Sequence, residues 1–271
     1  MNRLKNILDT IPDQQLASYL QSAAKAALAG GKIVKDLFDQ PHSITMKGEI
    51  DLVTEADPAS EAAILKILSA AFPDIPNMAE ESAKSKEMPE QPTWVIDPLD
   101  GTTNYAHGFP VFGVSIALMQ KETSLVGVVY CPMADELFCA AKGVGAWLNG
   151  EPIHTTSTSE LIESLVATGF PYEIHTHLDR VMEQLRKVLP AVRDVRRAGA
   201  AAVDLAYTAC GRLDGFWEMD LKPWDTAAGR LLVEEAGGIT SDFNGQAYSP
   251  FKAEIIAANP AIHQKLRSLI A

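Results

Sequence analysis

The chain has 271 residues, 47% of them hydrophobic and 21% charged, which is typical of a folded globular protein and excludes a disordered chain. With 23 Lys and Arg against 35 Asp and Glu, the formal net charge is −12, so the surface as a whole does not attract nucleic acid or anionic membrane. A phosphorylated ligand would be repelled too. A phosphate site here therefore needs a local positive source, for which metal ions are the simplest candidate.

The cysteines and the apolar runs indicate the cellular compartment in which we expect the protein. Cys131, Cys139 and Cys210 form no CxxC pair, and their odd number argues against a complete disulfide framework. Asp9 comes too early for the apolar stretch of a signal peptide, and the longest apolar run, residues 111–119, is too short to span a bilayer. We therefore expect a cytoplasmic protein that does not enter the membrane.

The first half of the chain predicts two helices followed by a run of strands. Good helix formers fill residues 13–38, with Gly30 and Gly31 as a weak point. Asp57, which is followed by proline, is typical of a helix N-cap and predicts a helix to about Phe72. Strands are predicted over residues 51–54, 93–96, 111–119, 124–130 and 136–141, the last three as an antiparallel meander, and a polar loop over residues 82–92.

After Gly150 the pattern changes to alternating helices and strands. The predicted strands are residues 165–168, 213–218 and 255–258, and the predicted helices are residues 177–189, 200–210, 224–236 and 260–270. The predicted fold class is therefore α/β, with an α+β half over residues 1–150 and an α/β half over residues 151–271. We expect the two halves to share one core, as a single domain over residues 1–271.

An acidic turn follows the strand predicted at residues 93–96. Asp97 and Asp100 are three positions apart, and Pro98 between them ends the strand in this prediction. The turn can bring both carboxylates, and the Leu99 carbonyl, to one side. Such oxygen ligands suit Mg²⁺. Because Asp also favours ordinary turns, the two carboxylates alone leave a structural role open.

The residues after this turn suit a phosphate. Gly101 permits a tight turn, and Thr102 can start a helix whose free N–H groups bind phosphate. Three further acidic positions are ambiguous when taken singly. Glu80 is consistent with a charged loop, and Asp57 and Asp225 are consistent with helix caps.

Taken together, these segments resemble the inositol monophosphatase family over nearly the whole chain. The bacterial members are the closest in appearance, and the one departure is Ala79, where the family usually has glycine. The motifs are D-L-V-T-x-x-D at 51–57, A-E-E-S at 79–82, W-x-x-D-P-x-D-G-T-T-N at 94–104, T-G-F-P-Y at 168–172, R-R-A-G-A-A-A at 196–202 and W-D-x-A-A-G at 224–229.

The resemblance implies a layered αβαβα sandwich, commonly a homodimer and sensitive to lithium, that uses two to three Mg²⁺ ions. One ion would be held by Glu80, Asp97 and the Leu99 carbonyl, a second by Asp97, Asp100 and Asp225, and a third, weaker ion would lie near Glu80. Thus Glu80, Asp97, Leu99, Asp100 and Asp225 are the implied metal ligands.

The resemblance also assigns the substrate contacts. Thr102 and Asp57 would orient or deprotonate the attacking water, with Glu80 beside the metal that activates it. The implied substrate-binding residues are Asp100, Gly101, Thr102, Gly199, Ala200, Ala201, Glu218 and Asp225, of which Gly101 and Thr102 would face the phosphate and Gly199, Ala200, Ala201 and Glu218 the alcohol.

The expected substrate is a small phosphorylated metabolite, with inositol 1-phosphate as the default. Glu218 favours a polyol because a carboxylate accepts hydrogen bonds from vicinal hydroxyls. Fructose 1,6-bisphosphate, histidinol phosphate and 3′-phosphoadenosine 5′-phosphate stay open. So does a different class, a transcription-associated factor that binds a protein partner, since the net charge argues only against direct RNA binding. Arg193, Arg196 and Arg197 are predicted to form a salt-bridged surface or dimer edge, with substrate contact as the alternative.

Overall fold

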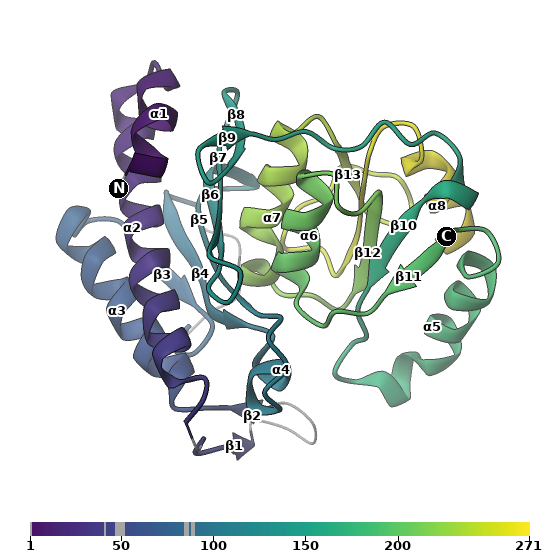
Figure 1. Ribbon diagram of the computed structural model, residues 1–271, viewed down its shortest axis with the longest axis horizontal. Helices are drawn as coiled ribbons and strands as arrows, with labels where there is room; N and C mark the ends of the chain where they lie inside the picture. The colour runs from purple at the N-terminus through teal and green to yellow at the C-terminus, as the bar shows by residue number, and fades with distance from the viewer. Residues whose placement is uncertain (1, 41, 47–51, 84–86, 88–89) are drawn as a thin grey trace.

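The computed structural model describes residues 2–40, 42–46, 52–83, 87 and 90–271 (Figure 1). These residues fold into layers in the order helix, sheet, helix, sheet, helix (Figure 1). The layered α/β sandwich expected from the sequence is confirmed. The helices are α1 (Asn2–Thr10), α2 (Gln14–Leu37), α3 (Ala56–Ala71), α4 (Thr102–Ala106), α5 (Ile174–Val188), α6 (Ala201–Ala209), α7 (Pro223–Glu235) and α8 (His263–Ile270), with a 3₁₀ turn at Leu161–Glu163.

The larger sheet has seven strands, which follow one another in chain order across the sheet. The first pair is parallel and the remaining pairs are antiparallel, which confirms the predicted meander. Its strands are β3 (Asn77–Ala79), β4 (Thr93–Asp100), β5 (Gly113–Gln120), β6 (Thr123–Cys131), β7 (Glu136–Ala141), β8 (Gly145–Leu148) and β9 (Glu151–Pro152).

The smaller sheet has five strands in the order β11-β10-β12-β14-β13. Strand β10 is parallel to both of its neighbours, and β14 is antiparallel to both of its own. The strands are β10 (Leu165–Thr168), β11 (Asp194–Arg196), β12 (Gly215–Met219), β13 (Ile239–Ser241) and β14 (Glu254–Ala258); a separate pair joins β1 (Thr45–Met46) to β2 (Leu52–Val53).

Three large hydrophobic clusters fill the spaces between the layers. One lies between α2, α3 and the larger sheet, and includes the buried Trp94. A second joins the other face of that sheet to α6, α7 and the smaller sheet, and includes Trp224. The third covers the outer face of the smaller sheet with α5 and α8. The middle helices therefore share apolar contacts with both sheets.

Helix α2 runs without interruption through Gly30 and Gly31, so the predicted weak point is wrong. A Cβ atom at Gly30 would lie 2.6 Å from Oγ of Ser60, and one at Gly31 would lie 2.3 Å from the Tyr130 ring. The two glycines thus allow α3 and β6 to approach α2 closely, and this packing outweighs their low helix propensity.

Strand β4 continues through Pro98 to Asp100, whereas the sequence predicted that it ends before the proline. The pairing with β5 shifts register between Asp97 and Asp100, as in a β-bulge. Proline lacks an N–H donor, and a bulge is a place where a strand tolerates that loss. The bulge puts both carboxylates at the end of a buried strand.

Two predicted helix caps are also corrected. Helix α3 begins at Ala56 with Glu55 in the cap position, so Asp57 lies inside the first turn. Helix α7 begins at Pro223, and Asp225 lies at its third position, where its Oδ2 accepts a 2.7 Å hydrogen bond from the Lys222 N–H. Both carboxylates are therefore placed within a helical turn rather than ahead of it.

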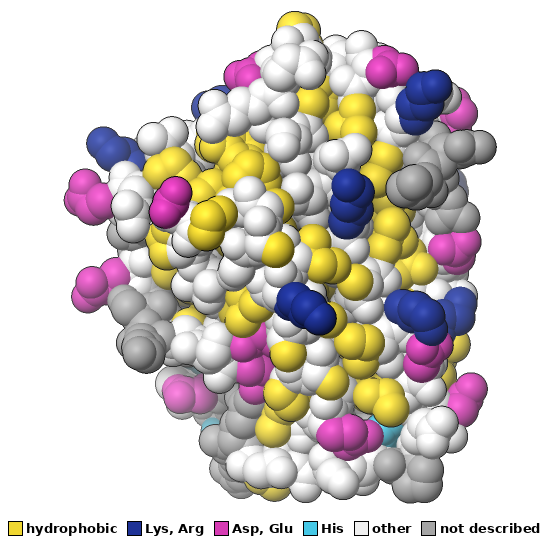
Figure 2. Space-filling model, turned by 90° about the vertical axis from the view of Figure 1, so that its left-hand side faces the viewer, with side chains coloured by type: hydrophobic (Ala, Val, Ile, Leu, Met, Phe, Trp, Pro, Cys, Tyr) yellow, Lys and Arg dark blue, Asp and Glu magenta, His cyan; other side chains and the backbone are white. Residues whose placement is uncertain are grey.

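Among the described residues, no helix is long and apolar enough to cross a membrane. The face in Figure 2, formed largely by α1, α2 and α3, mixes charges of both signs with hydrophobic side chains. The net charge of −12 is thus not gathered into one acidic field among the side chains described on this face. The cysteines at 131 and 139 are free and buried.

Candidate active site

A cavity of about 390 Å³ opens where the end of β4 and the start of α4 meet the end of β12 and the start of α7. Residues far apart in the sequence line it together. Of the predicted site residues, Asp57 and Ala200 are absent from its lining. Those that line it are Glu80, Asp97, Leu99, Asp100, Gly101, Thr102, Gly199, Ala201, Glu218 and Asp225.

The β4 bulge holds the two central carboxylates by backbone hydrogen bonds. Oδ1 of Asp97 accepts the Leu99 N–H at 2.9 Å, which fixes the turn between the two aspartates. The Asp100 carboxylate accepts N–H groups from Ala201 at 3.2 Å and from Ala202 at 2.9 Å, at the start of α6. The N-terminus of a helix favours negative charge, so α6 stabilises Asp100 from outside the cavity.

These carboxylates repel one another inside the protein. Burial, followed by the charges of Glu80, Asp100 and Asp225, holds the pKa of Asp97 well above its usual range. Burial raises the pKa of Asp100 to about 7, although the backbone N–H groups of α6 oppose the shift. A buried acidic cluster of this kind cannot remain fully ionised without a compensating cation.

The donor chemistry of this cluster fits a hard divalent cation, because carboxylate and carbonyl oxygens are the ligands that such ions prefer. Within the described ranges, however, no group of three or more His, Cys, Asp and Glu side chains already has a ligand arrangement. Asp97 and Asp225 each direct an oxygen to a backbone N–H group instead. These hydrogen bonds use one oxygen of each carboxylate, so acceptor capacity is left for a bound ion.

Thr102 occupies the first position of α4, directly after Gly101, whose φ of 94° is left-handed. A Cβ atom on Gly101 would also lie 3.0 Å from the Val111 carbonyl oxygen, so glycine is required here for two reasons. The Thr102 hydroxyl lies 3.0 Å from both Oδ1 of Asp57 and the Leu99 carbonyl oxygen. The short helix α4 thus directs the Thr102 hydroxyl towards Asp57, which lies in α3.

Asp57 is held in place from its other side. Its Oδ2 accepts hydrogen bonds from the backbone N–H of Thr54 at 2.9 Å and from the Thr54 hydroxyl at 2.7 Å. Burial raises the pKa of Asp57, while the hydrogen bonds from Thr54 oppose the shift. Asp57 is therefore an oriented acceptor behind Thr102, one side chain removed from the cavity wall.

Ala79, the departure from the family pattern, lies fully buried in β3. Its carbonyl accepts the Ala83 N–H at 2.7 Å, and the neighbouring Glu80 N–H donates to the Ile96 carbonyl at 3.1 Å. The methyl group packs in the cluster that includes Trp94. The extra carbon is thus accommodated in the core, and the backbone beside Glu80 stays paired with β4.

The other end of the cavity is formed around Glu218, on β12. This side chain lies directly over Gly169, where an added Cβ atom would come within 2.0 Å of the Glu218 carboxylate. Burial raises the pKa of Glu218 well above its usual range, and the charge of Arg197 acts in the opposite direction. The guanidinium of Arg197 in turn lies 5.0 Å from the centre of the Phe170 ring.

The three arginines predicted as one basic surface divide in the structure. Arg196 forms an ion pair with Asp194, as the surface prediction requires, whereas Arg197 lines the cavity. Behind it, Asp204 is buried in α6, and its Oδ2 has no hydrogen-bond partner among the described residues. No local sequence signal separates the two arginines, because the difference depends on Phe170, which belongs to another segment.

Comparisons with known proteins agree with this arrangement. The sequence model of the inositol monophosphatase family matches residues 15–271. An inositol-1-monophosphatase of Synechocystis sp. is 44% identical over 257 residues, which cover 94% of this chain and 90% of that protein. The Nus factor SuhB of Escherichia coli K12 is 41% identical over 245 residues, covering 90% of this chain and 92% of that protein.

The fold is shared with solved structures. The structure of an inositol monophosphatase from Anabaena (Nostoc) sp. PCC 7120 superposes with a TM-score of 0.85 at 40% sequence identity. The match covers 94% of this chain and 96% of that one. The similarity therefore extends through both sheets and both ends of the cavity.

Proposed function

The chain belongs to the inositol monophosphatase family and is a phosphoric monoester hydrolase; from this premise we propose that it hydrolyses inositol 1-phosphate with Mg²⁺ and a water nucleophile. The family uses divalent metal ions. The observation that carries the proposal is the buried acidic cluster around Asp97, which faces a hydroxyl and a helix start suited to phosphate. The relative from Synechocystis supports the choice of substrate by its name.

In this proposal Glu80, Asp97 and the Leu99 carbonyl hold one Mg²⁺, and Asp97, Asp100 and Asp225 hold a second, with a third, weaker ion near Glu80. When bound, the ions would cancel the charge of the phosphate and lower the pKa of a bound water. The pKa of Asp97, raised by burial and by its acidic neighbours, supports this assignment, because a cation relieves that repulsion.

Phosphate binding and water orientation fall to the start of α4. The backbone N–H groups at Gly101 and Thr102 would donate to phosphate oxygens. The Thr102 hydroxyl lies 3.0 Å from Asp57, and this pair would orient the attacking water or take its proton. Because Asp57 is itself held by Thr54, its carboxylate is a fixed acceptor beside the hydroxyl, which also lies 3.0 Å from the Leu99 carbonyl oxygen.

Glu218 and the backbone of residues 199–201 would face the departing alcohol. A carboxylate at this end accepts hydrogen bonds from vicinal hydroxyls, which a polyol supplies and an aryl group does not. Burial raises the pKa of Glu218, and the charge of Arg197 opposes that rise and so favours the ionised form that can accept them. This end of the cavity would select the alcohol without taking part in the bond cleavage.

A phosphate-release assay tests the proposal. The panel contains inositol 1-phosphate, fructose 1,6-bisphosphate, histidinol phosphate and 3′-phosphoadenosine 5′-phosphate, each with Mg²⁺, with Mg²⁺ and Li⁺, and with EDTA. The proposal predicts the highest kcat/KM on inositol 1-phosphate, inhibition by Li⁺ and loss of activity with EDTA. A higher kcat/KM on another member of the panel would replace the substrate, and no release from any of them would contradict the proposal.

A second candidate function comes from the relatives named Nus factor SuhB, in Escherichia coli and Salmonella typhimurium, which are 41% identical over 245 residues. Under this proposal the chain binds a protein of the transcription machinery. Complementation of a null strain with Asp97→Asn separates the two roles, since the variant should lack phosphatase activity. Full complementation would assign the cellular role to protein binding, and failure by a normally folded variant would assign it to catalysis.

We also propose a homodimer of single-domain subunits in the cytoplasm. Inositol monophosphatases are the type of protein that the comparisons return, and the family resemblance implies a dimer. Light scattering on the purified chain would give a mass near twice 29.3 kDa if this is correct. A mass of one chain at micromolar concentration would contradict it.

A further inference from the structure

The hydrogen bond between Thr102 and Asp57 joins two segments of the chain, and His42 contacts both of these segments. Its Nδ1 lies 3.0 Å from Oε1 of Glu55, which occupies the cap position of α3 two residues before Asp57. Its ring packs against that of Tyr105, with 4.6 Å between the centres and 39° between the planes. Tyr105 lies in α4, three residues after Thr102. Through Glu55 and Tyr105, His42 is therefore linked to the segments of both Asp57 and Thr102.

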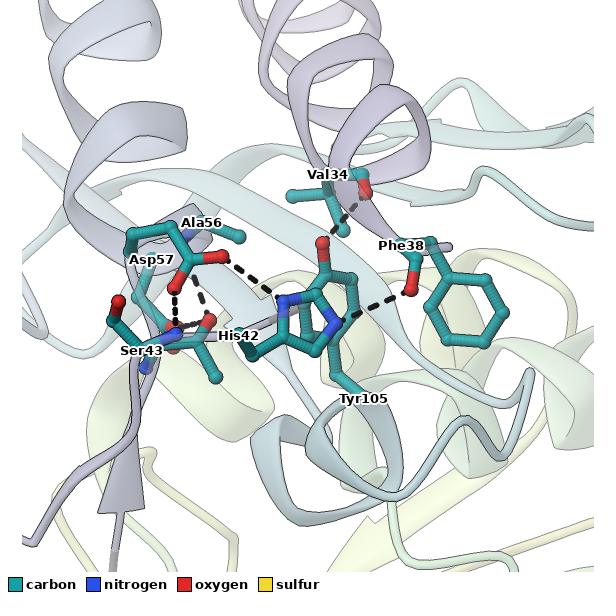
Figure 3. A network of polar contacts seen from close by, with 9 residues as sticks. Val34, Phe38, His42, Ser43, Ala56, Asp57 and Tyr105 are labelled. Carbon is teal, nitrogen blue, oxygen red and sulfur yellow. Dashed lines mark hydrogen bonds and ion pairs between the residues drawn. The ribbon is translucent and has the colours of Figure 1, made fainter. Parts of the chain in front are cut away.

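The polar contacts of His42 restrain its ring at both nitrogens. Besides the contact with Glu55, its Nε2 lies 3.2 Å from the Phe38 carbonyl oxygen at the end of α2, and Figure 3 shows the ring between these partners. A carboxylate and a carbonyl are both acceptors, so both contacts are hydrogen bonds only when each ring nitrogen carries a proton. The side chain is 9% exposed, which shields these bonds from water.

Glu55 has a polar contact at each of its two carboxylate oxygens. Its second oxygen, Oε2, accepts the Ser43 N–H at 2.7 Å. Burial alone would raise the pKa of Glu55, but the hydrogen bonds from His42 and from backbone N–H groups outweigh it and hold the pKa below its ordinary value. The carboxylate therefore stays charged at neutral pH.

Tyr105 gives His42 a rigid support on the other side. The Tyr105 ring is fully buried, and its hydroxyl donates a 2.9 Å hydrogen bond to the Val34 carbonyl oxygen, as Figure 3 shows. The ring also packs against Phe38 and Phe112, with centres 5.4 Å and 5.1 Å away. Tyr105 therefore transmits the position of His42 to the backbone of α4.

A hydrogen bond also joins α3 to the end of β4. The Ser60 hydroxyl donates to the Pro98 carbonyl oxygen at 2.9 Å, one turn further along the helix. This bond holds the second turn of α3, and the first turn, with Asp57, is fixed by contacts of its own. The link through His42 acts at that first turn and reaches directly to the helix that carries Thr102.

We infer that His42 is a positioning residue: through Glu55 and Tyr105 it sets the first turn of α3 relative to α4 and so keeps the Thr102 hydroxyl in line with Asp57. This inference rests on the proposed function, in which that pair orients the attacking water. His42 touches no part of the cavity and acts only through the two side chains beside it. Its loss would lower the rate of the chemical step and leave the binding of the alcohol unchanged.

Three variants of the full-length protein test this inference. His42→Phe keeps a ring against Tyr105 and removes both hydrogen bonds, His42→Gln keeps one donor, and Glu55→Gln removes the paired charge. We expect kcat on inositol 1-phosphate to fall about tenfold in His42→Phe and less in His42→Gln, since small misplacements near the reacting atoms are costly. KM should stay within about twofold. His154→Phe, at an exposed histidine outside the cavity lining, is the matched control and should match the wild type.

Two further measurements separate positioning from simple stability. If His42 acts through Glu55, the double variant of His42→Phe and Glu55→Gln should lose no more activity than the stronger single variant. Amide hydrogen exchange of α4, measured without metal, should be faster in His42→Phe than in the control. Additive losses, a change confined to KM, or a kcat equal to the wild type at temperatures where the variant is folded would each overturn the inference.

Asp57→Asn, assayed in parallel, distinguishes failure of this inference from failure of the proposed function. If the wild type releases phosphate and Asp57→Asn does not, while His42→Phe is fully active, the positioning role is wrong and the proposed function stands. If Asp57→Asn retains full activity, the pair itself has no catalytic role, so the positioning inference fails while the phosphatase activity stands. If the wild type shows no release from any substrate of the panel, the proposed function fails first.

Discussion

The two ends of the cavity are built in different ways. The end proposed to bind the phosphate, called the phosphate end, comes largely from one continuous segment, in which the β4 bulge, Gly101 and Thr102 follow one another directly. The end proposed to face the alcohol, called the alcohol end, brings together Gly169, Arg197 and Glu218, each from a different segment. An end built from one segment can keep the same reaction while an end built from several segments changes its selectivity. Variants at the phosphate end should therefore lower the rate on all substrates, and variants at the alcohol end should alter the preference between substrates.

The largest effect is expected at the phosphate end. Asp97→Asn should lower kcat on every phosphomonoester by about a thousandfold or more, because it removes the carboxylate proposed to bridge two metal ions. Phosphate release with saturating Mg²⁺ measures the loss. Asp194→Asn, which removes an exposed partner of Arg196, is the control and should keep its activity. Comparable activity in both variants would contradict the role given to the phosphate end.

A change at the alcohol end should discriminate between substrates. Glu218→Gln should lower kcat/KM on inositol 1-phosphate about tenfold, because an amide is a weaker acceptor for the substrate hydroxyls than a carboxylate. An aryl phosphate without vicinal hydroxyls should be affected less than twofold. Equal losses on the two substrates would remove the distinction between the two ends.

A substitution at Gly169, which lies against Glu218, should perturb the alcohol end less than Glu218→Gln does. Gly169→Ala would place a carbon about 2.0 Å from the Glu218 carboxylate, so that side chain must shift. We expect a loss of a few-fold on inositol 1-phosphate, in the same direction as Glu218→Gln and again weaker on an aryl phosphate. A variant that affects both substrates alike would show that the glycine serves the fold rather than selectivity.

The smallest expected effect concerns the stability of the metal-free protein. Burial raises the pKa of Asp100 to about 7, so the folded state binds a proton that the unfolded state releases near pH 4. The stability from this group is present below pH 4 and is lost as the pH rises towards 7. The melting temperature in EDTA should therefore fall by a few degrees between pH 5 and pH 8.

Asp100→Asn tests the origin of this pH dependence, because an amide does not titrate. Its melting temperature in EDTA should change less between pH 5 and pH 8 than that of the wild type. Mg²⁺ should also reduce the change in the wild type, since a bound cation stabilises the ionised carboxylates. An unchanged pH dependence in the variant would assign the effect to other groups.

The sequence alone anticipated the phosphate end better than the alcohol end. The segment from Asp97 to Thr102 is continuous, so its spacing alone suggested an oxygen-ligand site beside a phosphate site, and the family resemblance then chose this reading over an ordinary turn. The detail was wrong at Pro98, because a bulge depends on pairing with β5 and not on the proline itself. The assigned roles of these residues remain proposals.

The cavity role of Arg197 and the position of His42 could not be predicted in the same way. Arg197 resembles its neighbour Arg196 in sequence, and only contacts with Phe170 and the charge of Glu218 distinguish it. His42 lies between α2 and β1, in a stretch with no helical or strand period, and its significance comes from Glu55 and Tyr105. Long-range packing determines both positions.

Short elements were missed for a related reason. Strands β3, β8 and β9 are two to four residues long, too short for an alternating pattern to be visible. Asp57 was placed as a helix cap from the proline after it, whereas the cap position falls on Glu55. The hydrogen bond to Thr102, which gives Asp57 its proposed role, joins residues 45 positions apart.

The central claim is that the carboxylates around Asp97 bind divalent metal, and calorimetric titration of Mg²⁺ into the metal-free protein tests it most directly. We predict binding to the wild type with a stoichiometry of two or more ions per chain in the presence of inorganic phosphate. The Asp97→Asn variant should show little or no heat under the same conditions, while Asp194→Asn should match the wild type. Identical titrations of the wild type and Asp97→Asn would contradict the account.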